Sequence, residues 1–134
     1  MWHHRIDLMR SWERARMGRL TTHVLDTAHG RPGGGIAVTV YRLGASDARL
    51  EVARAVTNAD GRTDRPVLEG ADFIPGVYEI VFAAGDYFAR TSAKLPHPPF
   101  VGDVVLRFGV ANPAEHYHVP LLVSPWSYQT YRGS

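Results

Sequence analysis

The sequence predicts an all-β domain, a sandwich or a barrel. From Leu20 onward, roughly six to eight short runs of β-type residues follow one another, the number and spacing typical of such folds. Turn-forming segments such as "HGRPGGG" and "TNADGR" separate these runs. Within residues 36–43, the aliphatic residues Ile36, Val38 and Val40 stand at every second position. They therefore share one face of a strand, which indicates that this face points toward a core.

Four strands are expected in the first half of the chain. "LTTHVLD" (20–26), "IAVTVYRL" (36–43) and "LEVARAVT" (50–57) are rich in the β-branched and apolar residues that favour strands. "TNADGR" ends the third run, because Asn and Asp-Gly tolerate positive φ in a turn. A short fourth strand is expected at 65–68, directly after this turn.

The second half predicts four more strands and one helix. "VYEIVFA" (77–83) follows the break "FIPG", and "AGDYFAR" (84–90) is expected to form a short helix directly after it. Later strands follow the breaks "KLPHPP", "GVANPAE" and "SP", and are expected at 103–109, 116–123 and 126–131. At 134 residues the chain is most simply one domain.

The first residues, "MWHHRIDLMRSWERARMG", differ in composition from the rest. We therefore expect a leader at 1–18 and a folded domain at 19–134. The formal net charge is +2, but arginines gather in the leader and leave the remaining chain with a slight acidic excess. Because nucleic-acid binding needs a basic face on the folded body, no nucleic-acid partner is expected.

The composition excludes a membrane-spanning helix and cysteine-based sites, and the two ends of the chain lack known targeting signals. No apolar run approaches the roughly 20 residues that a membrane helix needs, so no membrane partner is expected. The absence of cysteine excludes disulfides, thiolate metal ligands and a cysteine nucleophile. The leader lacks the apolar stretch of a secretory signal, and the chain has no peroxisomal Ser-Lys-Leu-type ending. A cytoplasmic location is therefore expected.

The segment "EHYHVPLLVSP" places two histidines on one face of an expected strand. Alternate residues point the same way, so His116 and His118 share a face opposite the apolar one. They fit two solvated side chains, or general acid–base chemistry near neutral pH. They also fit a metal site whose further ligand comes from His23, Asp26 or His29. The spacing alone does not choose among these interpretations.

Three other features are ambiguous by themselves. His23 lies in the first expected strand, where a lone histidine is more often structural than catalytic. Arg62 follows the Asp-Gly turn and is either a solvated charge or a cation fixed on a rigid turn. The ending "YRGS" follows a strand-like segment without a polar linker, so we expect an ordered terminus. His29 and His97 lie in expected loops and are interpreted as solvated.

Four segments carry a resemblance to a known family: "LTTHVLDTAHGRP", "TNADGR", "GVYEIVFAAGDYF" and "HYHVPLLVSPWSYQTYRGS". In this order they resemble the 5-hydroxyisourate hydrolases, the transthyretin-related enzymes of urate degradation in purine catabolism. The resemblance implies a transthyretin-like sandwich of two four-stranded antiparallel sheets with one short helix. It also implies a homotetramer, a dimer of dimers, with active sites in channels at the dimer–dimer interface.

The same resemblance implies hydrolysis of 5-hydroxyisourate to 2-oxo-4-hydroxy-4-carboxy-5-ureidoimidazoline, with no cofactor and no metal. The family's catalytic residues fall on His23, Arg62, His118 and Ser134, and substrate binding falls on His23, Arg62 and Tyr131. One of the two histidines, held neutral, would deprotonate the attacking water, and the residues do not decide which. A supporting role for His116 stays open.

Two other functions remain as alternatives. The first is a non-catalytic transthyretin-like carrier of a small ligand. The second is a metal-dependent hydrolase that uses His23, His116 and His118 as ligands.

Overall fold

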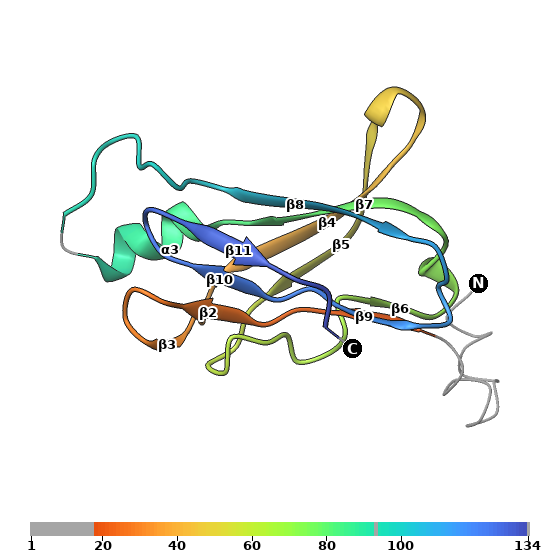
Figure 1. Cartoon of the computed structure of the whole chain (residues 1–134), viewed down its shortest axis with the longest axis horizontal. Coiled ribbons are helices and arrows are strands. Elements are labelled where there is room, and N and C mark those ends of the chain that lie inside the picture. The colour runs from red at the N-terminus through yellow and green to blue at the C-terminus, as the bar shows by residue number, and fades with distance from the viewer. Residues whose placement is uncertain (1–17, 93, 134) are drawn as a thin grey trace.

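The computed structural model describes residues 18–92 and 94–133 (Figure 1). Of the leader expected at 1–18, all but Gly18 lies outside the described residues, and so does Ser134. Gly18 is buried and donates its N–H to the carbonyl oxygen of Pro113 at 2.9 Å. The packed part of the chain therefore includes Gly18.

One four-stranded sheet is antiparallel throughout, in the order β5-β4-β7-β8. Val38 and Val40 are buried while Ala37 is exposed, which confirms the alternation expected for this segment. A register shift between Val40 and Tyr41 marks a β-bulge. The strands are β4 (Ala37–Leu43), β5 (Arg49–Val56), β7 (Gly76–Phe82) and β8 (Val104–Val110).

The other strands form a three-stranded sheet, β6-β1-β9, and a second four-stranded sheet, β11-β10-β2-β3. In these, β1 runs parallel to β9 and β2 runs parallel to β10. The expectation of two antiparallel four-stranded sheets is therefore corrected. The structure has three sheets, and two of the strand pairings are parallel. The strands are β1 (Arg19–Thr21), β2 (Val24–Asp26), β3 (Arg31–Pro32), β6 (Leu68–Glu69), β9 (His116–His118), β10 (Leu121–Val123) and β11 (Tyr128–Thr130).

The strands expected at 20–26 and 116–123 are each divided by a local break, the first into β1 and β2 and the second into β9 and β10. Pro120 has no N–H and cannot donate to a ladder. The hydroxyl of Thr22 donates to the carbonyl oxygen of Val119 at 2.7 Å at this point. After the break, the N–H of Leu121 donates to the carbonyl oxygen of His23 at 2.9 Å. The two segments therefore stay side by side through the break, as β1 beside β9 and then β2 beside β10. The pocket described below lies at β1 and β9.

The expected helix is confirmed as α3 (Ala84–Thr91). The expected run at 65–68 overlaps the two-residue strand β6 only at Leu68, and 126–131 is shortened to β11. Two short 3₁₀ turns, η1 (Ala45–Asp47) and η2 (Gly70–Asp72), and the two-residue strand β3 were not predicted.

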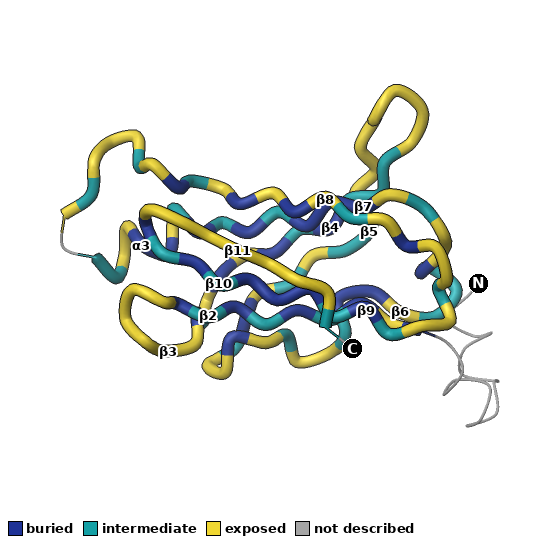
Figure 2. The backbone as a smooth tube through the Cα atoms, in the orientation of Figure 1, coloured by how far each residue is buried: buried dark blue, intermediate teal, exposed yellow. Residues whose placement is uncertain are grey.

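Residues from all the sheets are buried in one hydrophobic core, and Figure 2 shows the buried stretches along the backbone. Tyr117, Val119, Leu121 and Val123 are buried, which confirms the predicted core face of the late strands. His116 and His118 lie on the other face and are half-buried. Among the helices of the described residues, none is both long enough and apolar enough to cross a membrane.

Candidate active site

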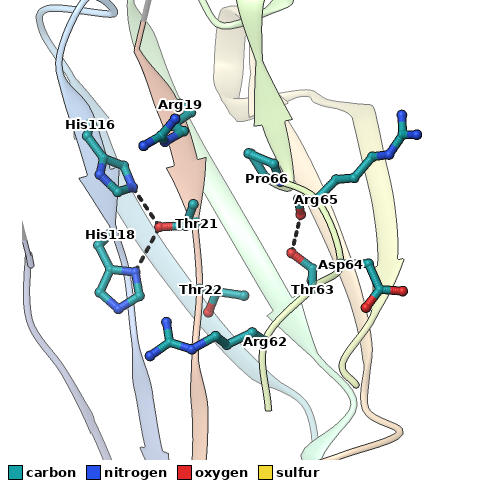
Figure 3. Close-up of a pocket in the computed structure, with 10 residues that line it drawn as sticks. All are labelled: Arg19, Thr21, Thr22, Arg62, Thr63, Asp64, Arg65, Pro66, His116 and His118. Carbon is teal, nitrogen blue, oxygen red and sulfur yellow. Dashed lines mark hydrogen bonds between the residues drawn. The ribbon is translucent and has the colours of Figure 1, made fainter. Parts of the chain in front are cut away.

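A pocket of about 330 Å³ lies between the paired strands β1 and β9 on one side and the segment that follows the Asp-Gly turn on the other (Figure 3). It contains two of the residues predicted to be catalytic, Arg62 and His118, together with His116. The lining residues are Arg19, Thr21, Thr22, Arg62, Thr63, Asp64, Arg65, Pro66, His116 and His118.

Strand register sets the histidine wall of the pocket. Parallel pairing places Arg19 beside His116 and Thr21 beside His118. Side chains at paired positions point to the same face, so the hydroxyl of Thr21 lies between the two imidazoles (Figure 3). Its Oγ1 is 2.8 Å from Nε2 of His116 and 2.8 Å from Nδ1 of His118. One hydroxyl therefore holds both rings in place.

Both imidazoles of this wall favour the neutral form. Burial is the largest cause that lowers the pKa of His118, and the charges of Arg62, His116 and His23 lower it further. Burial also lowers the pKa of His116, with Arg19 as the second cause. A neutral imidazole carries a lone pair and can accept a proton, so this wall suits a general base.

The opposite wall carries Arg62, which a rigid turn holds in place. Gly61 has φ +77, and a Cβ there would lie 2.3 Å from the carbonyl oxygen of Val24, so the turn requires glycine. Oδ1 of Asn58 accepts the N–H of Asp60 at 2.9 Å and that of Arg62 at 3.2 Å. The side chain of Arg62 is exposed at the pocket and can bind an oxyanion bidentately.

His23 is adjacent to this pocket but does not line it. Its backbone pairs with that of Arg62 as an isolated antiparallel bridge. Its Nε2 lies 2.8 Å from the carbonyl oxygen of Asp60, which can only accept, so Nε2 carries the hydrogen. In the neutral ring, Nδ1 is then the free acceptor. In the charged form, His23 would repel a charge on His118, and this is one of the causes that lower the pKa of His118.

The end of the chain lies against the same strand. Gly133 donates its N–H to the carbonyl oxygen of His118 at 2.7 Å. The guanidinium carbon of Arg132 is 4.1 Å from the ring centre of Tyr117, and its Nη2 is 3.0 Å from Oε1 of Glu115. Tyr131, predicted to bind substrate, is 58% exposed and does not line the pocket. The described part of the tail thus pairs with β9 through Gly133.

The other histidines considered as ligands are separated from this wall. His29 is exposed in a turn, as expected, and in addition donates from Nδ1 to Oδ2 of Asp26 at 2.6 Å. Asp26 is buried and also accepts the hydroxyl of Tyr87 at 2.7 Å. Among residues 18–92 and 94–133, no group of three or more His, Asp or Glu side chains is placed to hold a metal ion.

Sequence reasoning missed Thr21, Arg19 and Arg65 as pocket residues. One signal was available for Thr21, since alternate residues of a strand share a face and Thr21 lies two positions before His23. No comparable signal marks Arg65, which reaches the pocket from a loop.

Comparison with known proteins gives the family of this chain. Residues 20–133 match the HIUase/Transthyretin family. The chain is 59% identical over 118 residues to the 5-hydroxyisourate hydrolase of Pseudomonas aeruginosa, covering 88% of this chain and 93% of that protein.

Solved structures agree with this match. The structure of (S)-allantoin synthase aligns with a TM-score of 0.83 at 42% identity, over 99% of this chain and 49% of that one. Transthyretin from Sparus aurata aligns with a TM-score of 0.77 at 28% identity, over 86% of this chain and 96% of that one. The extent of these matches shows that the chain belongs to the HIUase/transthyretin family.

Proposed function

We propose that this protein is a hydrolase that converts 5-hydroxyisourate to 2-oxo-4-hydroxy-4-carboxy-5-ureidoimidazoline in urate degradation. The observation that carries the proposal is the convergence of His118 and Arg62 on one pocket from strands and turns far apart in the sequence. The name and 59% identity of the Pseudomonas aeruginosa relative support the substrate. We assign the activity to a domain formed by residues 19–134.

The pocket offers the groups that hydrolysis of a cyclic amide-like C–N bond requires. Such a reaction needs a base for water, a donor for the developing oxyanion and an acid for the leaving nitrogen. His118, whose pKa is lowered mainly by burial, is the proposed base. Arg62 is the proposed partner of the substrate's oxygens, because its planar fork binds such groups and stays charged.

Three further residues complete the proposed site. His23, with its Nδ1 free to accept, is proposed to contact the substrate or the water from beside Arg62. Tyr131 is proposed to cover the substrate and Ser134 to donate from the chain terminus. The hydrogen bond from Gly133 to His118 supports both assignments, since it joins the tail to the strand that carries this histidine.

We also propose that four copies assemble as a dimer of dimers and that the strands form the two-layered transthyretin-type sandwich. A partner would cover the face of β9 and β11 and close the pocket. The aromatic side chains of Trp126, Tyr128 and Tyr131, which lie in β11 or close to it in the sequence, are exposed and support this proposal. The cytoplasmic location expected from the sequence stays a prediction.

The test of the activity is a spectroscopic assay with freshly generated 5-hydroxyisourate. Decay well above the spontaneous rate, lost in His118→Ala, supports the proposed hydrolase. The likeness to Sparus aurata transthyretin makes a non-catalytic carrier the alternative. Saturable binding of a purine-like ligand with decay at the spontaneous rate would favour that carrier.

A further inference from the structure

The hydroxyl of Thr21 contacts two imidazoles at once and has only one hydrogen to give. Its Oγ1 lies 2.8 Å from a nitrogen of each ring, Nε2 of His116 and Nδ1 of His118. A hydroxyl donates once and accepts through two lone pairs. Both ring nitrogens therefore cannot be acceptors, and at least one of them must carry a hydrogen that points at Thr21.

The chemistry proposed for His118 selects among the remaining arrangements. A neutral imidazole has one protonated and one free nitrogen. For His118 to take a proton at Nε2, its single hydrogen must lie on Nδ1 and be donated to Thr21. The Thr21 hydrogen is then free to be donated to Nε2 of His116.

We propose that Thr21 is a positioning residue that keeps His118 in the Nδ1–H tautomer, with the Nε2 lone pair free to accept a proton from the attacking water. His116 completes the arrangement by accepting the Thr21 hydrogen at its Nε2. Water then loses its proton to Nε2 of His118 as its oxygen adds to the substrate's carbonyl carbon, whose π electron pair moves to the carbonyl oxygen. When that oxyanion collapses and the C–N bond breaks, the proton passes from Nε2 to the leaving nitrogen. This inference rests on the hydrolysis proposed above.

Local structure favours a fixed role for this hydroxyl. Thr21 is β-branched, which restricts its side-chain rotamer, and it lies in a strand that is paired on both sides. It is half-buried, with its hydroxyl between the two rings. Among the described residues, Nε2 of His118 makes no hydrogen bond, so this nitrogen is free for a water or a substrate.

The charges around the two rings favour neutral imidazoles, which the arrangement requires. The charges that act on His118 are those of Arg62, His116 and His23, and the charge of Arg19 acts on His116. Burial and these groups lower the pKa of both rings. Near neutral pH, each ring therefore has one unprotonated nitrogen. In His118, the hydrogen bond to Thr21 sets which of the two nitrogens is unprotonated.

The direct test is ¹⁵N NMR of protein labelled at its histidines, at mildly alkaline pH and without substrate. The nitrogen shifts distinguish protonated from free ring nitrogens, and His116 and His118 are assigned by substitution. We expect a hydrogen on Nδ1 of His118 and none on Nε2 of His116. A wild-type spectrum with the His118 hydrogen on Nε2 would overturn the proposal, whatever the variants do.

Variants separate positioning from simple structural support. Thr21→Val removes the hydroxyl but keeps the shape, and should abolish the tautomer preference, while Thr21→Ser should retain it. His116→Leu removes the acceptor without touching Thr21, and should weaken the same preference. Thr27→Val is the matched control, because that hydroxyl donates to the carbonyl oxygen of Val123 at 3.1 Å, outside the pocket. An unchanged His118 tautomer in Thr21→Val would also overturn the proposal.

Kinetics supply the second readout. Thr21→Val should lower kcat about tenfold, the rate equivalent of one lost hydrogen bond, with little change in KM and partial recovery in Thr21→Ser. A wild-type kcat in Thr21→Val would exclude the positioning role. If the wild-type protein does not hydrolyse 5-hydroxyisourate, the proposed function fails, and the NMR spectra alone then decide the tautomer assignment.

Discussion

Gly133 donates its backbone N–H to the carbonyl oxygen of His118 at 2.7 Å, so the chain end is fixed to the strand that carries the proposed base. A Cβ placed on Gly133 would lie 2.8 Å from Cδ2 of the His118 ring, closer than real Cβ contacts. The tail and the imidazole are therefore packed directly against each other. The position of either depends on the position of the other.

This packing predicts that Gly133→Val lowers turnover more than stability. The added side chain must displace the ring or the tail, and a displacement of this size at a catalytic group costs roughly tenfold to a hundredfold in rate. A terminus can move with little loss of folding free energy, so Tm should fall by only a few degrees. Kinetic assay and thermal unfolding give the two values.

Gly109→Ala is the control for this experiment. A Cβ at Gly109, in β8, meets no atom within 4 Å, and the residue lies outside the pocket. Its rate should remain that of the wild type. Equal losses of turnover in the two variants would contradict a specific contact between the tail and His118.

Arg62→Ala should reduce turnover by about a hundredfold or more, the cost typical of removing one preorganised donor for a developing oxyanion. Its side chain is exposed, so the free energy of unfolding should change by no more than about 0.5 kcal/mol. Arg62→Lys should give an intermediate rate, because it keeps the charge but loses the planar fork.

Arg54→Ala provides a matched surface control for Arg62. Arg54 is exposed on β5 and pairs with Glu51, with Nε 2.7 Å from Oε2. It takes no part in the pocket, so its variant should turn over at the wild-type rate. Near-normal turnover in Arg62→Ala would remove Arg62 from the proposed site.

The pH dependence of turnover should follow the lowered pKa of His118. Burial is the main cause of that lowering and Arg62 the next. The folded-state pKa then lies below the unfolded value of about 6.5, so the neutral form of the ring predominates at pH 6.5 and the charged form at lower pH. Turnover should be largely kept as the pH is lowered to 6.5 and should decrease at lower pH. The free energy of unfolding should also decrease as the pH drops from about 6.5 to the folded-state pKa.

Arg62→Gln tests the second cause separately. Without the guanidinium charge, the pKa of His118 should rise, and because burial remains, it should rise only part of the way. An NMR titration of His118 measures this shift even if the variant is nearly inactive. A titration curve that does not move would show that Arg62 has no electrostatic effect on the ring.

The sequence predicts the side-chain orientation in this site better than its strand pairing. Alternation alone separates Tyr117 and Val119 from His116 and His118, and the structure confirms that only the first pair belongs to the core. Local residue chemistry likewise predicts α3 and the turn before Arg62. Each of these features depends on residues close together in the chain.

The features that sequence reasoning missed depend on residues far apart in the chain. Thr21 contacts His118 across 97 positions, because β1 and β9 are parallel, and the expectation of antiparallel sheets gave no such pairing. Similarly, a long-range bridge places His23 beside Arg62. Register between distant strands is set by the packing of the whole core, which local patterns do not encode.

Asp26 predicts a pH-dependent contribution to stability that is independent of the pocket. Its buried carboxylate accepts the N–H groups of Ala28 and His29, Nδ1–H of His29 and the hydroxyl of Tyr87, which joins the turn after β2 to α3. Burial alone would raise the pKa of Asp26, but the hydrogen bonds from Tyr87 and His29 outweigh it and lower the pKa. The ionised form is therefore the one that stabilises the fold.

Asp26→Asn should lower the free energy of unfolding by about 1.5–3 kcal/mol at neutral pH, the range for hydrogen bonds to a charged group. Because the folded-state pKa lies below the ordinary value of about 3.9, this stabilisation is complete above that value and is lost as pH falls through the folded-state pKa. Denaturant unfolding of both proteins at neutral and acidic pH should therefore show curves that converge only in acid. A difference that stays constant with pH would mean that Asp26 acts through its shape and not its charge. Since Asp26 does not line the pocket, kcat of the folded variant should equal that of the wild type, which separates this cluster from the catalytic site.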